Sequence, residues 1–239
     1  MTMYPDANSR RIELEYGTTD RSMFNFFNAV YAWMAVGLAL TAAVGWGVSQ
    51  SPAMLNIIYG SRFVLIATAL GMFAIAWATQ SIALRISAAA GTAMFLLYCA
   101  LMGMFISYIF IVYQMKSLLA AFFVTGGVFA IMSVYGYVTK RDLTKIGTFA
   151  IMGMIGLFIA SLVNVFFASN MIDWIITYGV LIFTIIIAAY KTQDLKEMAQ
   201  QFEGSPDMLA RLSIVGSLIL YITFINMFLA VLRIMGSRK

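Results

Sequence analysis

The chain has 239 residues, of which 62% are hydrophobic and 10% are charged, whereas a soluble domain carries about 25% charged residues. This composition excludes an ordinary soluble protein, because so much apolar surface needs lipid to cover it. The net charge of +5 does not indicate a nucleic-acid-binding protein, since the basic residues form short clusters between long apolar runs and no stripe that follows a phosphate backbone.

The first 22 residues form a polar tail of mixed charge and low hydrophobicity. Such composition predicts a disordered segment. A cleavable signal peptide is not expected, because the first apolar run begins only near Met23 and follows acidic as well as basic residues. We therefore expect residues 1–22 to be a tail and residues 23–239 to be one transmembrane domain.

Seven apolar runs follow, most of them about as long as the 20 helical residues that cross a bilayer core of about 30 Å. They lack period-two alternation, and lipid cannot satisfy free backbone groups, so they predict helices. The fold class is therefore an all-α integral membrane protein with a bundle of seven transmembrane helices. The runs are 24–48, 63–79, 88–112, 117–138, 146–167, 174–190 and 212–234.

Ten of the 15 Lys and Arg residues lie on the side of the tail if all seven runs span. The positive-inside rule then places the N-terminus in the cytoplasm and the C-terminus outside. Three basic residues near the C-terminus, Arg233, Arg238 and Lys239, oppose this orientation. An even number of spans with one re-entrant run would resolve the conflict, and the sequence leaves that alternative open.

Ionisable residues are absent from the middle of every run and occur only at run ends, as at Asp173 and Arg233. Because the chain also has no histidine and a single cysteine, Cys99, we expect no enzyme activity, no catalytic residue, no metal site and no cofactor. The uncharged residues Asn164, Thr223 and Asn226 are candidates for a polar path through the bundle. Interhelical hydrogen bonding is the alternative.

Several short motifs occur in combination along the chain and together resemble the bacterial branch of the Bax inhibitor-1 family. The resemblance implies seven helices with the last one central, a pH-sensitive calcium leak, and in some bacterial relatives a link to a membrane protease. The motifs are residues 110–113 (Phe-Ile-Val-Tyr), 135–144 (Tyr-Gly-Tyr-Val-Thr-Lys-Arg-Asp-Leu-Thr), 161–164 (Ser-Leu-Val-Asn), 190–193 (Tyr-Lys-Thr-Gln) and 221–226 (Tyr-Ile-Thr-Phe-Ile-Asn).

The pH sensor that the resemblance implies is a pair of aspartates, and this chain has Lys191 and Thr223 at those two positions. Two neighbouring carboxylates share a proton because each raises the other's pKa, which a lysine and a threonine cannot do. Asp194 lies about one helical turn after Lys191. It is a candidate replacement carboxylate, or a partner for Lys191 or Lys196.

The sequence therefore predicts a bacterial inner-membrane protein whose family-type calcium leak has a lost or altered pH sensor. A leak gated by other groups stays open as an alternative. A second alternative is a non-conducting regulatory protein that binds a membrane protease or another membrane protein. In either case the bilayer is the expected environment, with calcium as a candidate ligand and no nucleic acid.

Overall fold

The computed structural model describes residues 7–82, 87–202 and 204–239 of the chain. Helices make up this part of the protein, together with short turns and one isolated bridge between Tyr113 and Arg238, so the all-α prediction is confirmed. The helices within these ranges are α1 (Ala7–Ser49), α2 (Pro52–Tyr59), α3 (Arg62–Ile82), α4 (Ala88–Ile106), α5 (Ile109–Val112), α6 (Met115–Val138), α7 (Thr144–Phe167), α8 (Asn170–Gln201) and α9 (Pro206–Met235).

Six segments in the described ranges are long and apolar enough to cross a membrane: Arg21–Ser49 in α1, Ala88–Val112 across α4 and α5, α6, Thr144–Asn164 in α7, α8 and α9. They correspond to six of the seven predicted runs. The remaining run, 63–79, lies in α3, whose apolar stretch Ile66–Thr79 is shorter. At 1.5 Å per residue this stretch is about 21 Å long, less than the bilayer core of about 30 Å.

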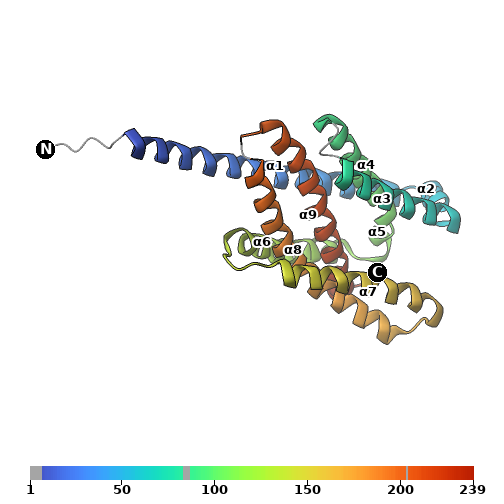
Figure 1. The fold of residues 1–239 in the computed structure, drawn as a ribbon. Coiled ribbons are helices and arrows are strands. Elements are labelled where there is room, and N and C mark those ends of the chain that lie inside the picture. Colours follow the sequence, from blue (N-terminus) through green and yellow to red (C-terminus); the bar gives the residue numbers. More distant parts are fainter. Residues whose placement is uncertain (1–6, 83–86, 203) are drawn as a thin grey trace.

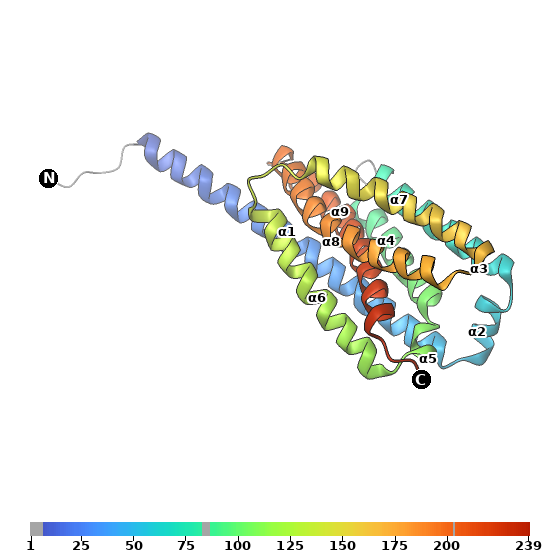
Figure 2. The same cartoon turned by 90° about the horizontal axis from the view of Figure 1, so that it is seen from below.

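Helices α1 and α4 run parallel to each other. Gly37 of α1 lies against Phe95 of α4, and Gly45 lies against Gly103, so the contacts advance together along both helices. Gly45 of α1 and Gly103 of α4 face each other. Because neither has a side chain, the two backbones approach closely. Along the chain, α3 follows α1 and precedes α4, and Figure 2 shows it running in the opposite direction to both.

Helices α7 and α8 are antiparallel, since Gly147 of α7 lies against Tyr190 and Gly153 lies against Phe183. Helices α8 and α9 are also antiparallel. Leu195 in the second half of α8 lies against Gly216 in the first half of α9. At the opposite end, Asp173 near the start of α8 pairs with Arg233 near the end of α9. Neighbouring helices therefore alternate in direction along this part of the chain, as short connections require.

The last helix, α9, lies inside the bundle. Of its membrane-spanning window 72% is buried, against 11–39% for the other five, and it packs against α1, α4, α6 and α8. Buried polar groups fix its position: Ser217 donates to the carbonyl of Val30, and the hydroxyls of Tyr221 and Thr41 are hydrogen-bonded. This agrees with the central last helix that the resemblance implies.

Helix α1 begins at Ala7, so residues 7–22 of the predicted tail are helical in the structure, whereas residues 1–6 lie outside the described residues. The physical reason is that extending an existing helix by one residue adds one hydrogen bond without a new nucleus, so a stable membrane helix propagates into a polar flank. In Figures 1 and 2 this first part of α1 projects beyond the bundle. Its cytoplasmic location stays a prediction.

Candidate functional site

Lys191 lies on α8 and forms an ion pair with Asp194, three residues on, with 2.9 Å between Nζ and Oδ2. Its ammonium group also lies over the ring of Tyr190, 4.9 Å from the centroid. Of the roles that the sequence left open for Asp194, the structure contains the pairing with Lys191. Both side chains are partly shielded, at 22% and 29% exposed, so the carboxylate faces a cation and not a second carboxylate.

Thr223 is buried on α9, and its hydroxyl donates 2.9 Å to the carbonyl of Ile219 on the same helix. Asn226 does the same, with its side-chain amide donating 2.9 Å to the carbonyl of Ile222. Both groups thus satisfy a donor on their own helix, one turn back. These two hydrogen bonds therefore lie within α9 and do not connect it to another helix.

A cleft of about 410 Å³ opens beside Thr223 and Asn226, between α3, α7, α8 and α9. Thr184 and Ile187 line this cleft from α8. Lys191 lies on the same face of α8, one helical turn after Ile187. Among the hydrogen bonds and ion pairs of the described residues, none joins Lys191 to Thr223. The lining residues are Phe73, Ile151, Met154, Ile155, Phe158, Thr184, Ile187, Ile222, Thr223 and Asn226.

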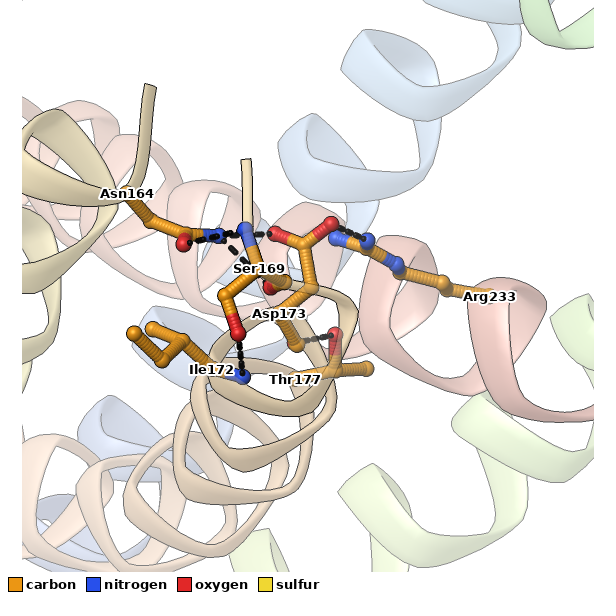
Figure 3. Close-up of polar contacts among 6 residues, drawn as sticks. All are labelled: Asn164, Ser169, Ile172, Asp173, Thr177 and Arg233. Atoms are coloured by element: carbon orange, nitrogen blue, oxygen red, sulfur yellow. Dashed lines mark hydrogen bonds and ion pairs between the residues drawn. The ribbon is translucent and has the colours of Figure 1, made fainter. Parts of the chain in front are cut away.

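Asn164, a candidate for the polar path, lies in the last turn of α7, beside the turn that leads to α8, and not in this cleft. Its side-chain amide donates to the carbonyl of Ser169 and to Asp173, and its oxygen accepts from the Ser169 N–H (Figure 3). Asp173 in turn pairs with Arg233 of α9 at 2.8 Å. Because Ala168 in this turn adopts a left-handed conformation with φ of 47°, these bonds hold a strained connection.

At the opposite end of the bundle, Gln193 joins two of the sequence motifs. Its side-chain oxygen accepts 2.8 Å from the N–H of Leu143, and its amide donates 2.8 Å to the carbonyl of Arg141. Lys196 adds a bond of 2.9 Å to the carbonyl of Tyr137. The loop between α6 and α7 is therefore clamped to α8.

Sequence reasoning missed the roles of Gln193 and of the pair Asp173–Arg233. The position of Asp173 in the first turn of a helix was a signal, because a carboxylate is favourable there, but nothing in the sequence names Arg233 as its partner. Among the described residues, no three of His, Cys, Asp and Glu gather at one place.

Comparison with known proteins decides the family. The family model described as "Inhibitor of apoptosis-promoting Bax1" matches residues 23–239. The chain belongs to the Bax inhibitor-1 family. This confirms the resemblance that the motifs indicated, and the match begins where the first apolar run was predicted to begin.

This Bax inhibitor-1 family member is also similar to bacterial proteins over most of its length. It is 42% identical over 212 residues to a protein of Escherichia coli strain K12 named "Inner membrane protein YbhL", covering 88% of this chain and 90% of that protein. It is 39% identical over 215 residues to a protein of Borreliella burgdorferi, covering 90% and 92%. A protein of Deinococcus radiodurans is 38% identical over 215 residues, covering 89% and 90%.

Proposed function

We propose that this chain is a multi-pass bacterial inner-membrane protein that forms a family-type calcium leak with an altered pH sensor. Family membership, the named inner-membrane relative in Escherichia coli and six helices long enough to span support the location. The observation that carries the altered sensor is the ion pair between Lys191 and Asp194. Lys191 occupies one of the two positions at which the resemblance implies aspartates that share a proton.

The consequence for gating follows from the chemistry of the two positions. Thr223 does not titrate, and Asp194 pairs with Lys191 and not with a second carboxylate. A coupled carboxylate pair would instead change its protonation between about pH 6 and 8. The proposed leak therefore lacks the steep acid-to-neutral response that the paired aspartates imply.

The proposal includes seven crossings, with the N-terminus in the cytoplasm and the C-terminus outside. The parallel packing of α1 and α4 supports the odd number of crossings. A chain that leaves α1 and enters a parallel α4 must first return across the bilayer, and α3 lies between these two helices in the sequence. Alkaline phosphatase fused after Lys239 should be active and a fluorescent protein should be dark. The reverse pattern would refute the odd number of crossings.

Calcium entry into liposomes that hold the purified protein tests the leak itself. A calcium dye inside the vesicles should report entry above that of protein-free vesicles, with rates at pH 6 and pH 8 that differ little. Entry that rises steeply across this range would refute the altered sensor. Absence of calcium entry at both pH values would refute the leak and favour the regulatory alternative.

The regulatory alternative has its own structural support in the projecting first part of α1 (Figure 2). Because this part of α1 extends past the other helices, another membrane protein can bind it. Deletion of residues 2–20 should then abolish crosslinking to a membrane protease or another membrane protein, while calcium entry is unchanged. Crosslinking that survives the deletion would refute this role for α1.

A further inference from the structure

An apolar slot of about 220 Å³ opens between α1 and α6, on the side of the bundle away from the cleft at Thr223. Its floor is α9, and its one polar lining side chain, Thr41, has its hydroxyl bonded to the carbonyl of Cys99 and to Tyr221. The slot therefore offers shape and apolar surface but no free hydrogen-bonding group. Representative lining residues are Leu38, Ile106, Phe110, Leu118, Phe122 and Phe228.

The slot opens toward lipid. Ala42 of α1 and Met115, Leu119 and Phe122 of α6 all line it and are exposed. Met115 is the first residue of α6, and Phe122 lies two turns further on, about 10 Å along the axis. The slot thus runs from the end of a spanning helix into one leaflet of the bilayer, where acyl chains are the neighbouring molecules.

A basic rim lies beside the end of the slot, and the C-terminal segment provides two of its three cations, Arg238 and Lys239. The N–H of Lys239 donates 2.8 Å to the carbonyl of Val112, and the carbonyl of Ser237 accepts 3.2 Å from Gln114. The ammonium group of Lys239 donates 3.0 Å to the carbonyl of Phe110, which itself lines the slot. Figure 2 shows the C-terminus beside α5 and the start of α6.

Two further cations complete this rim. Arg238 is bridged to Tyr113, and Lys116 follows Met115 directly at the start of α6. Lys116, Arg238 and Lys239 are all exposed. Asp173 is an acidic side chain at this end of the bundle, and it pairs with Arg233 and not with the three cations of the rim. The rim therefore keeps a net positive charge at the depth of the lipid headgroups.

We infer that this end of the bundle binds one anionic phospholipid, with an acyl chain in the slot and its phosphate at Lys116, Arg238 and Lys239. The charge of the rim is what selects an anionic lipid, because cations near a membrane surface attract anionic headgroups. The inference also gives a role to the C-terminal basic residues, which the positive-inside rule leaves unexplained. It is independent of calcium conduction and of the number of crossings.

The test combines lipid retention with mapping of the contact. The full-length protein in detergent is exposed to equal amounts of phosphatidylglycerol and phosphatidylcholine of the same chain length, and retained lipid is measured by native mass spectrometry. We expect phosphatidylglycerol to be retained several-fold more. Phosphatidylglycerol with a photoreactive group in its acyl chain should crosslink to peptides around residues 38–42 and 106–122.

Three variants sharpen the test. K116Q/R238Q/K239Q should lower phosphatidylglycerol retention to the level of phosphatidylcholine, while the matched control K140Q/R141Q/K145Q at the other end should not. Ala42→Phe should reduce retention and crosslinking of both lipids, because the larger side chain occupies the slot from an exposed position. Excess inorganic phosphate should not displace the lipid, since the apolar contacts are made by its chain.

Three outcomes would overturn the inference. The first is equal retention of the two lipids by the wild-type protein. The second is loss of preference in the control variant to the same degree as in K116Q/R238Q/K239Q. The third is crosslinking confined to peptides outside the slot, which would show that the basic rim and the slot do not act together. A melting temperature within a few degrees of wild type for each variant separates lost binding from lost folding.

Discussion

The side-chain oxygen of Gln193 on α8 accepts a hydrogen bond of 2.8 Å from the backbone N–H of Leu143, and both residues are buried. The same amide donates to the carbonyl of Arg141, so one side chain satisfies two backbone groups of the loop between α6 and α7. Two motifs that are about 50 residues apart in sequence therefore meet in one contact.

Gln193→Leu should destabilise the protein in detergent by about 1–3 kcal/mol, because it leaves a buried backbone donor without a partner. Thermal unfolding followed by circular dichroism measures the change. Gln200→Leu, at an exposed position of the same helix, is the matched control and should change the midpoint little. Equal effects of the two substitutions would show that the hydrogen bonds of Gln193 to Leu143 and Arg141 do not contribute to stability.

Rebuilding the acidic pair should create pH-dependent flux. Lys191→Asp together with Thr223→Asp places carboxylates at the two sensor positions, where a shared proton would titrate between about pH 6 and 8. We expect steep pH-dependent calcium entry into liposomes for the double variant and much weaker dependence for either single variant. Thr223→Asp combined with Gln200→Asp also introduces two carboxylates, but not as a neighbouring pair, and it should stay insensitive to pH in this range.

Two glycines of α6 should respond in opposite ways to the same substitution. A methyl group on Gly136 would collide with the backbone carbonyl of Ala189 on α8, whereas one on Gly127 would meet open space. Gly136→Ala should cost about 1–3 kcal/mol through overpacking, and Gly127→Ala should be neutral or stabilise by up to about 1 kcal/mol. Melting temperatures in one detergent decide this, and a larger loss for Gly127→Ala would contradict the packing of α6 on α8.

The pair of Asp173 and Arg233 should contribute little by charge and more by hydrogen bonding. Both side chains are about two-fifths exposed, so Arg233→Gln should cost under about 1 kcal/mol and less still in high salt. Asp173→Ala should cost more, because the Asn164 amide also loses one of its two acceptors. A double-mutant cycle measures the coupling. A coupling that is large and independent of salt would disagree with this account.

Asp142 should make stability depend on acid. Hydrogen bonds from the side chain and then the backbone of Thr144 lower the pKa of Asp142 from its ordinary 3.8. Because the folded pKa lies below the unfolded value, the stabilisation is present above about pH 4 and is lost as the pH falls through the folded pKa. Melting temperatures of the wild type and of Asp142→Asn should differ at pH 6 and converge toward pH 2. A constant difference would contradict the linkage.

The sequence by itself determined the class of fold, the family and most of the membrane segments. Apolar runs of this length have one outlet, which is lipid, and lipid permits only structures that satisfy their own backbone, so composition alone indicates a helical membrane protein. The motifs around Tyr135 and Tyr221 indicated the family without any structure. The same residue types showed that Lys191 and Thr223 do not form a carboxylate pair, because that conclusion depends on chemistry and not on distance.

Only the tertiary structure decided which residues meet. Neither Gln193 nor Arg233 has a pattern that names its partner, since interhelical contacts depend on how whole helices cross and not on local spacing. Asn164 lies in the last turn of α7, within the predicted run, but only the structure shows that its side chain bonds Ser169 and Asp173 across the connection to α8. The position of the basic C-terminal residues beside an apolar slot also depends on tertiary structure. Because α9 is central in the bundle, its end lies next to α5 and α6.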